Sequence, residues 1–85
     1  MRYIVSTTTH DAITGTQIDS WDGDITEADS REEASREAAK WEADLLRSDG
    51  ADIIEVTDDS VIYRQDGEEF RIQIHVDIEP DQKGE

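Results

Sequence analysis

Cysteine is absent from this sequence of 85 residues, and proline occurs only once. Without cysteine the chain can form neither a disulfide framework nor a thiolate metal site. Hydrophobic residues make up only 34% of the sequence, and no apolar run approaches the ~20 residues of a membrane-spanning helix. The first residues enter a strand pattern directly, without the apolar core of a signal peptide. We therefore expect one small cytoplasmic domain with no membrane segment.

Basic residues are also few, because 8 Lys and Arg stand against 23 Asp and Glu, for a net charge of −15. Half of the bases fall in residues 31–48 beside five acids, so that segment carries −1 and the rest of the chain carries −14. Such a surface repels nucleic acids and anionic membranes, and it attracts basic proteins over a distance set by salt. The composition therefore favours a protein that binds a basic partner.

The clearest local pattern predicts a helix over residues 31–48. Ser30 and Glu33 have the spacing of a capping box, in which the hydroxyl accepts the N–H of Glu33 and the carboxylate reaches back to the N–H of Ser30. Four apolar residues then recur at helical spacing: Ala34, Ala38, Trp41 and Leu45. We expect this stripe to pack against a sheet, which places Trp41 in the core. Gly50 follows as the residue that ends the helix.

The remaining segments predict strands at residues 2–8, 16–27, 53–57, 61–65 and 70–79. In the second strand the inward candidates Ile18 and Ile25 differ in parity, so a bulge or kink is expected near residues 21–23. Asp66-Gly67 predicts a hairpin turn. In the last strand the even-numbered residues are apolar and the odd-numbered ones polar, which predicts one buried and one solvated face.

These elements predict an α+β fold of order β-β-α-β-β-β, in which a single mostly antiparallel sheet carries one helix on one face. Residues 1–79 form the domain, and residues 80–85 are expected to be a flexible tail. The open face of the sheet should be mainly polar, with Ile4, Ile53 and Ile62 as exceptions. If these three cluster, that face could support a homodimer.

No pattern predicts catalytic residues, a cofactor or a metal site. His10, expected in a loop, and His75, on the outer face of the last strand, lack metal-ligand spacing. The glycines are isolated, and no nucleophile motif is present. Part of a calcium-loop spacing begins at Asp22, but Glu27 stands where that loop needs glycine, which leaves only a weak, non-specific divalent site open. An enzyme is therefore the least favoured class.

Stretches of acidic residues are the candidate binding surface. Side chains two residues apart on a strand lie on one face about 6.6 Å apart, and Asp22 and Asp24 have that spacing. Such carboxylates resemble phosphates on a rigid support and would pair with Arg and Lys of a nucleic-acid-binding protein. Beside them Trp21 is expected in the core, with a role as a partner anchor as the alternative. The predicted partner-binding residues are Asp19, Asp22, Asp24, Glu27, Asp29, Asp58, Asp59, Asp66, Glu68 and Glu69.

Residues 21–39, in which a strand leads through Ser30-Arg-Glu-Glu-Ala into a helix, resemble a pattern of small phage and mobile-element proteins. Several anti-CRISPR and anti-restriction proteins are similar in size, acidity and β-β-α-β-β layout. The matching stretch covers about a quarter of the chain and brings no functional residue with it. The resemblance implies a small inhibitor protein.

The leading hypothesis is an acidic binding protein that inhibits a nucleic-acid-handling protein by presenting a surface that mimics nucleic acid. The alternative is a structural or protein-interaction domain whose acidity serves solubility or a high-salt cytoplasm, which the scarcity of lysine would suit. The nearly balanced helix speaks against this alternative, because a salt-adapted surface should be acidic on every side.

Overall fold

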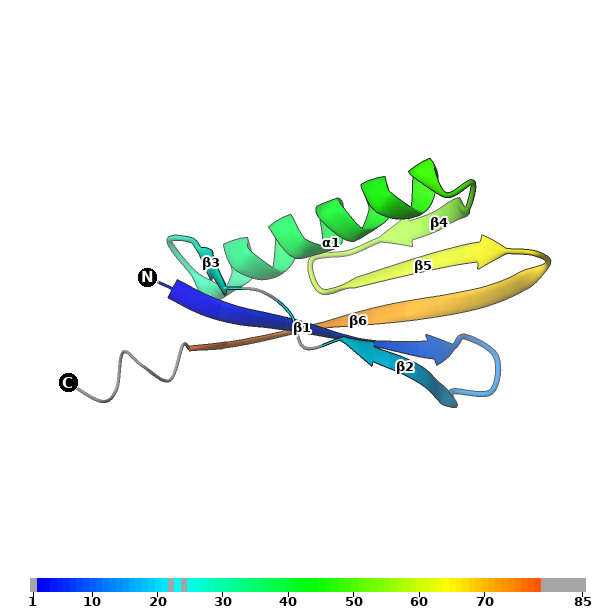
Figure 1. Ribbon diagram of the computed structural model, residues 1–85, viewed down its shortest axis with the longest axis horizontal. Coiled ribbons are helices and arrows are strands. Elements are labelled where there is room, and N and C mark those ends of the chain that lie inside the picture. Colours follow the sequence, from blue (N-terminus) through cyan, green and yellow to red (C-terminus); the bar gives the residue numbers. More distant parts are fainter. Residues whose placement is uncertain (1, 22, 24, 79–85) are drawn as a thin grey trace.

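A computed structural model describes residues 2–21, 23 and 25–78 of the chain. One helix packs on one face of a single antiparallel sheet, which confirms the predicted α+β fold and its element order (Figure 1). The predicted tail at residues 80–85 lies outside the described residues. The elements are β1 (Arg2–Asp11), β2 (Gln17–Trp21), β3 (Ile25–Glu27), α1 (Arg31–Ser48), β4 (Asp52–Val56), β5 (Ser60–Gln65) and β6 (Glu68–Ile78).

The strand order is β2-β1-β6-β5-β4, and β3 pairs with β1 beside β2. The long second strand predicted from the sequence is therefore broken into two, which confirms the expected kink. Thr7 pairs with Trp21 and Ile4 pairs with Ile25, so one extra residue is absorbed between these pairs. Gly23 lies in this break, where a Cβ atom would overlap the carbonyl oxygen of Val5. Only glycine allows the two backbones to approach so closely.

The prediction that Ile18 and Ile25 point inward is wrong. They are 54% and 47% exposed. Ile25 pairs with Ile4 at the edge of the sheet, and Ile18 falls where the pairing of β1 with β2 shifts by one residue. The kink instead turns Trp21 toward the helix side, because Trp21 pairs with the buried Thr7.

Helix α1 has the predicted bounds and N-cap. The Ser30 hydroxyl accepts the N–H of Glu33 at 3.1 Å. The Glu33 carboxylate accepts the N–H of Asp29 at 3.0 Å, one residue earlier than the capping box predicts. Asp49 caps the other end, and Gly50 follows in the left-handed region at φ +87°.

The face of α1 that meets the sheet differs from the predicted one. Its buried residues are Ala34, Ser35, Ala39 and Ala43. Of these, Ala39 and Ala43 pack with Val61, Ile72 and Ile74 in the core. Trp41 and Leu45 are 53% and 44% exposed, so the prediction that they lie in the core is wrong. The alanine row faces the sheet because small side chains let the helix approach it closely, whereas an indole in that row would hold it away.

The alternation of β6 is confirmed, with Ile72 and Ile74 buried on the helix side and His75 on the open face. His10 lies in β1 and not in a loop, because β1 continues to Asp11 and pairs there with Phe70.

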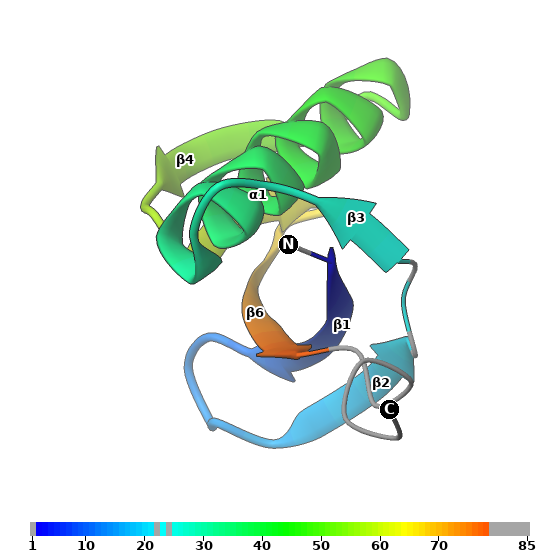
Figure 2. The same ribbon diagram turned by 90° about the vertical axis from the view of Figure 1, so that its left-hand side faces the viewer.

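The apolar cluster foreseen on the open face of the sheet does not form. Ile53 packs against the core beneath the helix. Ile4 and Ile62 lie opposite Asp77 and Arg71, which are six residues apart on β6, or about 20 Å. The observation on which the predicted homodimer depended is therefore missing. Seen end-on, the sheet curves, and α1 lies between β4 and β3 (Figure 2).

Candidate interaction surface

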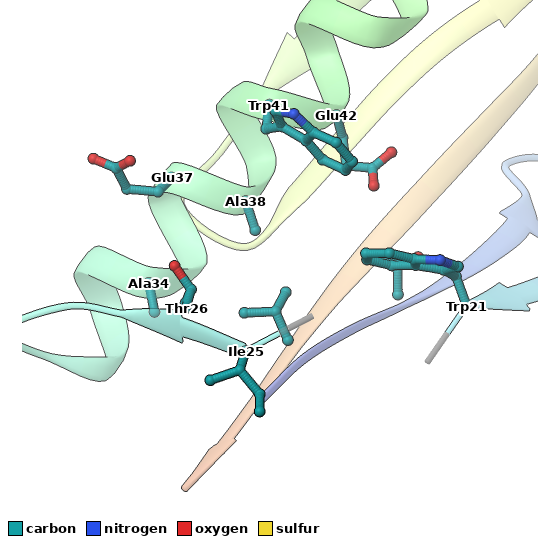
Figure 3. A pocket seen from close by; sticks show the side chains of 10 residues that line it. Trp21, Ile25, Thr26, Ala34, Glu37, Ala38, Trp41 and Glu42 are labelled. Atoms are coloured by element: carbon teal, nitrogen blue, oxygen red, sulfur yellow. The ribbon is translucent and has the colours of Figure 1, made fainter. Parts of the chain in front are cut away.

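A groove runs between α1 and the kinked strand pair β2 and β3 (Figure 3). Residues of β1 form its floor, and its volume is about 260 Å³. It continues along α1 toward Leu45 and the C-terminal half of β1. The lining residues are Val5, Thr7, Trp21, Ile25, Thr26, Ala34, Glu37, Ala38, Trp41 and Glu42, and in the continuation Thr9, Asp19, Ser20, Leu45 and Ile72. The helical stripe predicted as core therefore lines this groove.

Two tryptophans face each other across the groove. The ring centroids of Trp21 and Trp41 are 6.1 Å apart, and the ring planes meet at 30°. Trp21 is 42% exposed and therefore does not lie in the core as expected. Its ring folds back over Gly23, since a Cβ atom on that glycine would lie 2.9 Å from Trp21 Cζ3. The break between β2 and β3 thus positions one indole, and α1 positions the other.

The charged residues that line the groove are all acidic. Asp19 comes from the helix side of β2, while Glu37 and Glu42 come from α1. Partial burial raises the pKa of Glu42. The pKa of the Tyr63 hydroxyl is raised first by burial and then by the negative charges of Glu42 and Asp19. These two carboxylates therefore act on the same region beneath the groove.

The eight predicted partner-binding residues that the structure describes do not lie on one surface. Asp22 and Asp24 lie outside the described residues. Glu27 ends β3, and Asp29 precedes the N-cap of α1. A second group lies in the β4–β5 turn (Asp58 and Asp59) and a third at the β5–β6 turn (Asp66, Glu68 and Glu69). The β5–β6 turn and the N-terminus of α1 lie toward opposite ends of the molecule (Figure 1).

Several of these acids have local structural partners. Asp58 lies 3.7 Å from Arg36 Nε, and the carboxylate of Asp59 accepts the hydroxyl of Thr57 at 3.2 Å. Glu69 pairs with Arg64 at 2.7 Å. Exposed pairs of this kind contribute little to stability. They do show that some of these acids make contacts with neighbouring side chains of the fold.

Charge is distributed unevenly over the described residues. Their bases lie either on α1 or on the open face of the sheet, where Arg2, Arg64 and Arg71 stand among acids. Eight acids lie outside these two faces, in the turns and on β2 and the end of β6: Asp11, Asp19, Asp29, Asp49, Asp58, Asp59, Asp66 and Glu68. The acid surplus is therefore concentrated along the edges of the molecule.

The two histidines contact one threonine on the open face. Nε2 of His10 and Nε2 of His75 each lie 3.0 Å from the Thr8 hydroxyl oxygen. Within the described part of the chain, no group of three or more His, Asp or Glu is arranged to hold a metal ion. In that same part, α1 is too polar to be a membrane-crossing helix.

The groove and its residues Glu37 and Glu42 were not predicted from the sequence, and Leu45 was expected to pack against the sheet. One signal could have identified it. Ala39 directly follows Ala38, and Ala43 lies four residues further on, so small residues form a second row beside the row of Trp41 and Leu45. Small residues mark the helix face that can approach a sheet most closely.

No protein-family model matches the chain, no curated protein matches it, and no solved structure matches it.

Proposed function

We propose that this protein binds a basic, nucleic-acid-handling protein and inhibits it by placing carboxylates where nucleic-acid phosphates would bind. The observation that supports this is the uneven charge of the described residues: eight acids lie along the edges, where only Asp58 is paired with a base, Arg36 of α1, while α1 and the open sheet face are close to neutral.

Carboxylates are suited to this role because Arg and Lys side chains bind them much as they bind phosphates. An arginine pairs with either group through two parallel hydrogen bonds. The surplus charge also speeds encounter with a positive surface over roughly one Debye length, about 8 Å at physiological salt. The protein would then act without chemistry of its own, as a competitor for the nucleic-acid site.

The second candidate is a domain whose acidity serves solubility in high salt. It predicts a fold that loosens in dilute buffer through self-repulsion and becomes more stable in molar KCl. Thermal unfolding followed against KCl concentration tests this directly. An unfolding temperature that changes little between dilute buffer and molar salt contradicts it.

Affinity capture tests the proposed function. The protein is immobilised and exposed to host lysate in low salt, and the bound proteins are eluted in salt steps and identified. We expect a nucleic-acid-binding protein that elutes as salt rises and that free DNA or RNA competes away. Recovery of a partner that is indifferent to both salt and nucleic acid would contradict the proposal.

A matched pair of variants separates a local surface from net charge. The triple variant Asp22→Lys, Asp24→Lys, Glu27→Lys reverses three acids that neighbour one another in the sequence. The control Asp52→Lys, Glu55→Lys, Asp77→Lys reverses three exposed acids on the open face. The two variants have the same net charge. Weaker capture by the first alone is the expected result, and equal loss in both would show that only total charge matters.

A further inference from the structure

We infer that the groove between Trp21 and Trp41 docks a segment of the partner that carries an arginine beside an aliphatic side chain. This inference deepens the proposed function, because it says where a basic partner makes its specific contact.

The groove has an apolar surface that the fold itself does not cover. Trp21, Trp41 and Leu45 are each between 42% and 53% exposed, and they lie together on one groove. Exposed apolar surface of this kind, with a polar rim, marks a protein interaction site in small soluble domains. Tryptophan is also the residue most enriched at the energetic centre of interfaces. An aliphatic side chain of the partner would cover the two indoles.

Charge complementarity identifies the rest of the ligand. Asp19 and Glu42 line the same stretch of groove as both tryptophans, and the described residues of the lining include no base. Glu42 lies beside the Trp41 ring, on the side that faces Trp21 (Figure 3). A guanidinium can stack on an indole face while its N–H groups pair with a carboxylate, which an ammonium does less well. The partly buried Glu42 carboxylate would be stabilised by that cation.

The size of the groove agrees with a side-chain ligand. The stretch beside Ile25 has a volume of about 260 Å³ and the continuation past Leu45 one of about 280 Å³, which leaves space for two neighbouring side chains of a partner. A second copy of this chain is a poor occupant, because each copy carries a net charge of −15 and the groove itself is acidic.

To test this inference, the isotope-labelled protein is titrated with a short synthetic peptide that alternates arginine with leucine, and its N–H signals are followed by NMR. The chain contains 2 tryptophans, so two indole N–H signals report on the groove. We expect both signals to shift saturably. A peptide with citrulline in place of arginine keeps the shape and loses the charge, and one with serine in place of leucine loses the apolar contact. We expect each to bind about tenfold more weakly.

Variants locate the contact on the protein. Trp41→Ala and Asp19→Asn should each weaken binding of the arginine–leucine peptide, and we expect the tryptophan variant to bind it about tenfold more weakly. Two matched controls lie elsewhere: Asp77→Asn makes the same charge change on the open face of the sheet, and Ile54→Ala removes another exposed apolar side chain on β4. Both controls should bind like the unmodified protein. The remaining amide signals show whether each variant keeps the fold.

The outcomes distinguish this inference from the proposed function. If Trp41→Ala binds the peptide as tightly as the unmodified protein, the groove is not the docking site, although salt-dependent capture of a basic partner would still stand. If the indole signals do not respond to the peptide, or shift with protein concentration alone as a self-association site would, the inference is overturned. If the peptide binds the groove but capture finds no nucleic-acid-binding protein, the groove stands and the proposed inhibitor function fails.

Discussion

Two neighbouring alanines of α1 provide the sharpest test of this structure, because the sequence stripe and the observed packing assign them opposite roles. The stripe places Ala38 against the sheet and Ala39 beside it. In the structure Ala39 is fully buried in the core, at 0% exposure, while Ala38 is half-buried at the margin of the core and lines the groove. Ala38→Leu and Ala39→Leu make the same chemical change in the middle of one helix. Helix propensity therefore cancels between them.

The two substitutions are expected to change the free energy of unfolding in opposite directions. At Ala39 the larger side chain has no space beside Val61, and overpacking costs about 1–3 kcal/mol. At Ala38 the added atoms enter the groove and are partly buried, which stabilises by about 1 kcal/mol at ~0.8 kcal/mol for each buried methylene. The two variants should therefore differ by about 2–4 kcal/mol. For a domain of this size that separates their unfolding temperatures by roughly 10–25 °C.

Circular dichroism measures this difference in urea and in thermal unfolding, with the unmodified protein beside both variants. The packing described here would be refuted if Ala38→Leu were the more destabilised of the pair. Equal effects would show that neither residue faces a closely packed sheet.

Three further predictions follow from single contacts. Gly23→Ala should destabilise the fold by roughly 1–3 kcal/mol or more and change the tryptophan fluorescence, because the added Cβ would overlap the Val5 carbonyl. Gly15→Ala is the control: its Cβ would meet nothing within 4 Å, and only the φ of +78° is strained. Glu42→Gln should raise the free energy of unfolding at neutral pH and leave it unchanged well below pH 4.5. Burial raises the folded-state pKa of Glu42 above its usual 4.5, so the stability that the protonated carboxyl contributes is lost as pH rises through the folded-state pKa. Unfolding in urea at several pH values measures this, and a constant difference at all pH values would contradict it. Ser30→Ala should cost about 1 kcal/mol through the lost N-cap, with Ser30→Asp retaining most of the stability.

Local patterns in the sequence were sufficient for several features. The helix bounds, the Ser30 cap and the alternation of β6 depend on residues within a few positions of one another. The Asp66-Gly67 turn is equally local, because both residues take positive φ, +54° and +82°, as its hairpin type requires. The kink in the second strand was also predictable, since the apolar residues on either side of Gly23 differ in parity. Such features follow from backbone geometry that each short segment carries with it.

The tertiary structure alone decided which side of α1 is buried. Two apolar rows lie side by side on this helix, one of alanines and one that ends in Trp41 and Leu45, and helical spacing cannot choose between them. The alanines face the sheet because only small side chains permit the helix to approach Val61 and Ile72 closely. That choice turned the bulky row outward against the kinked edge strands and created the groove. The placement of the acids was decided in the same way, since which turns lie near each other depends on strand order and not on distance along the chain.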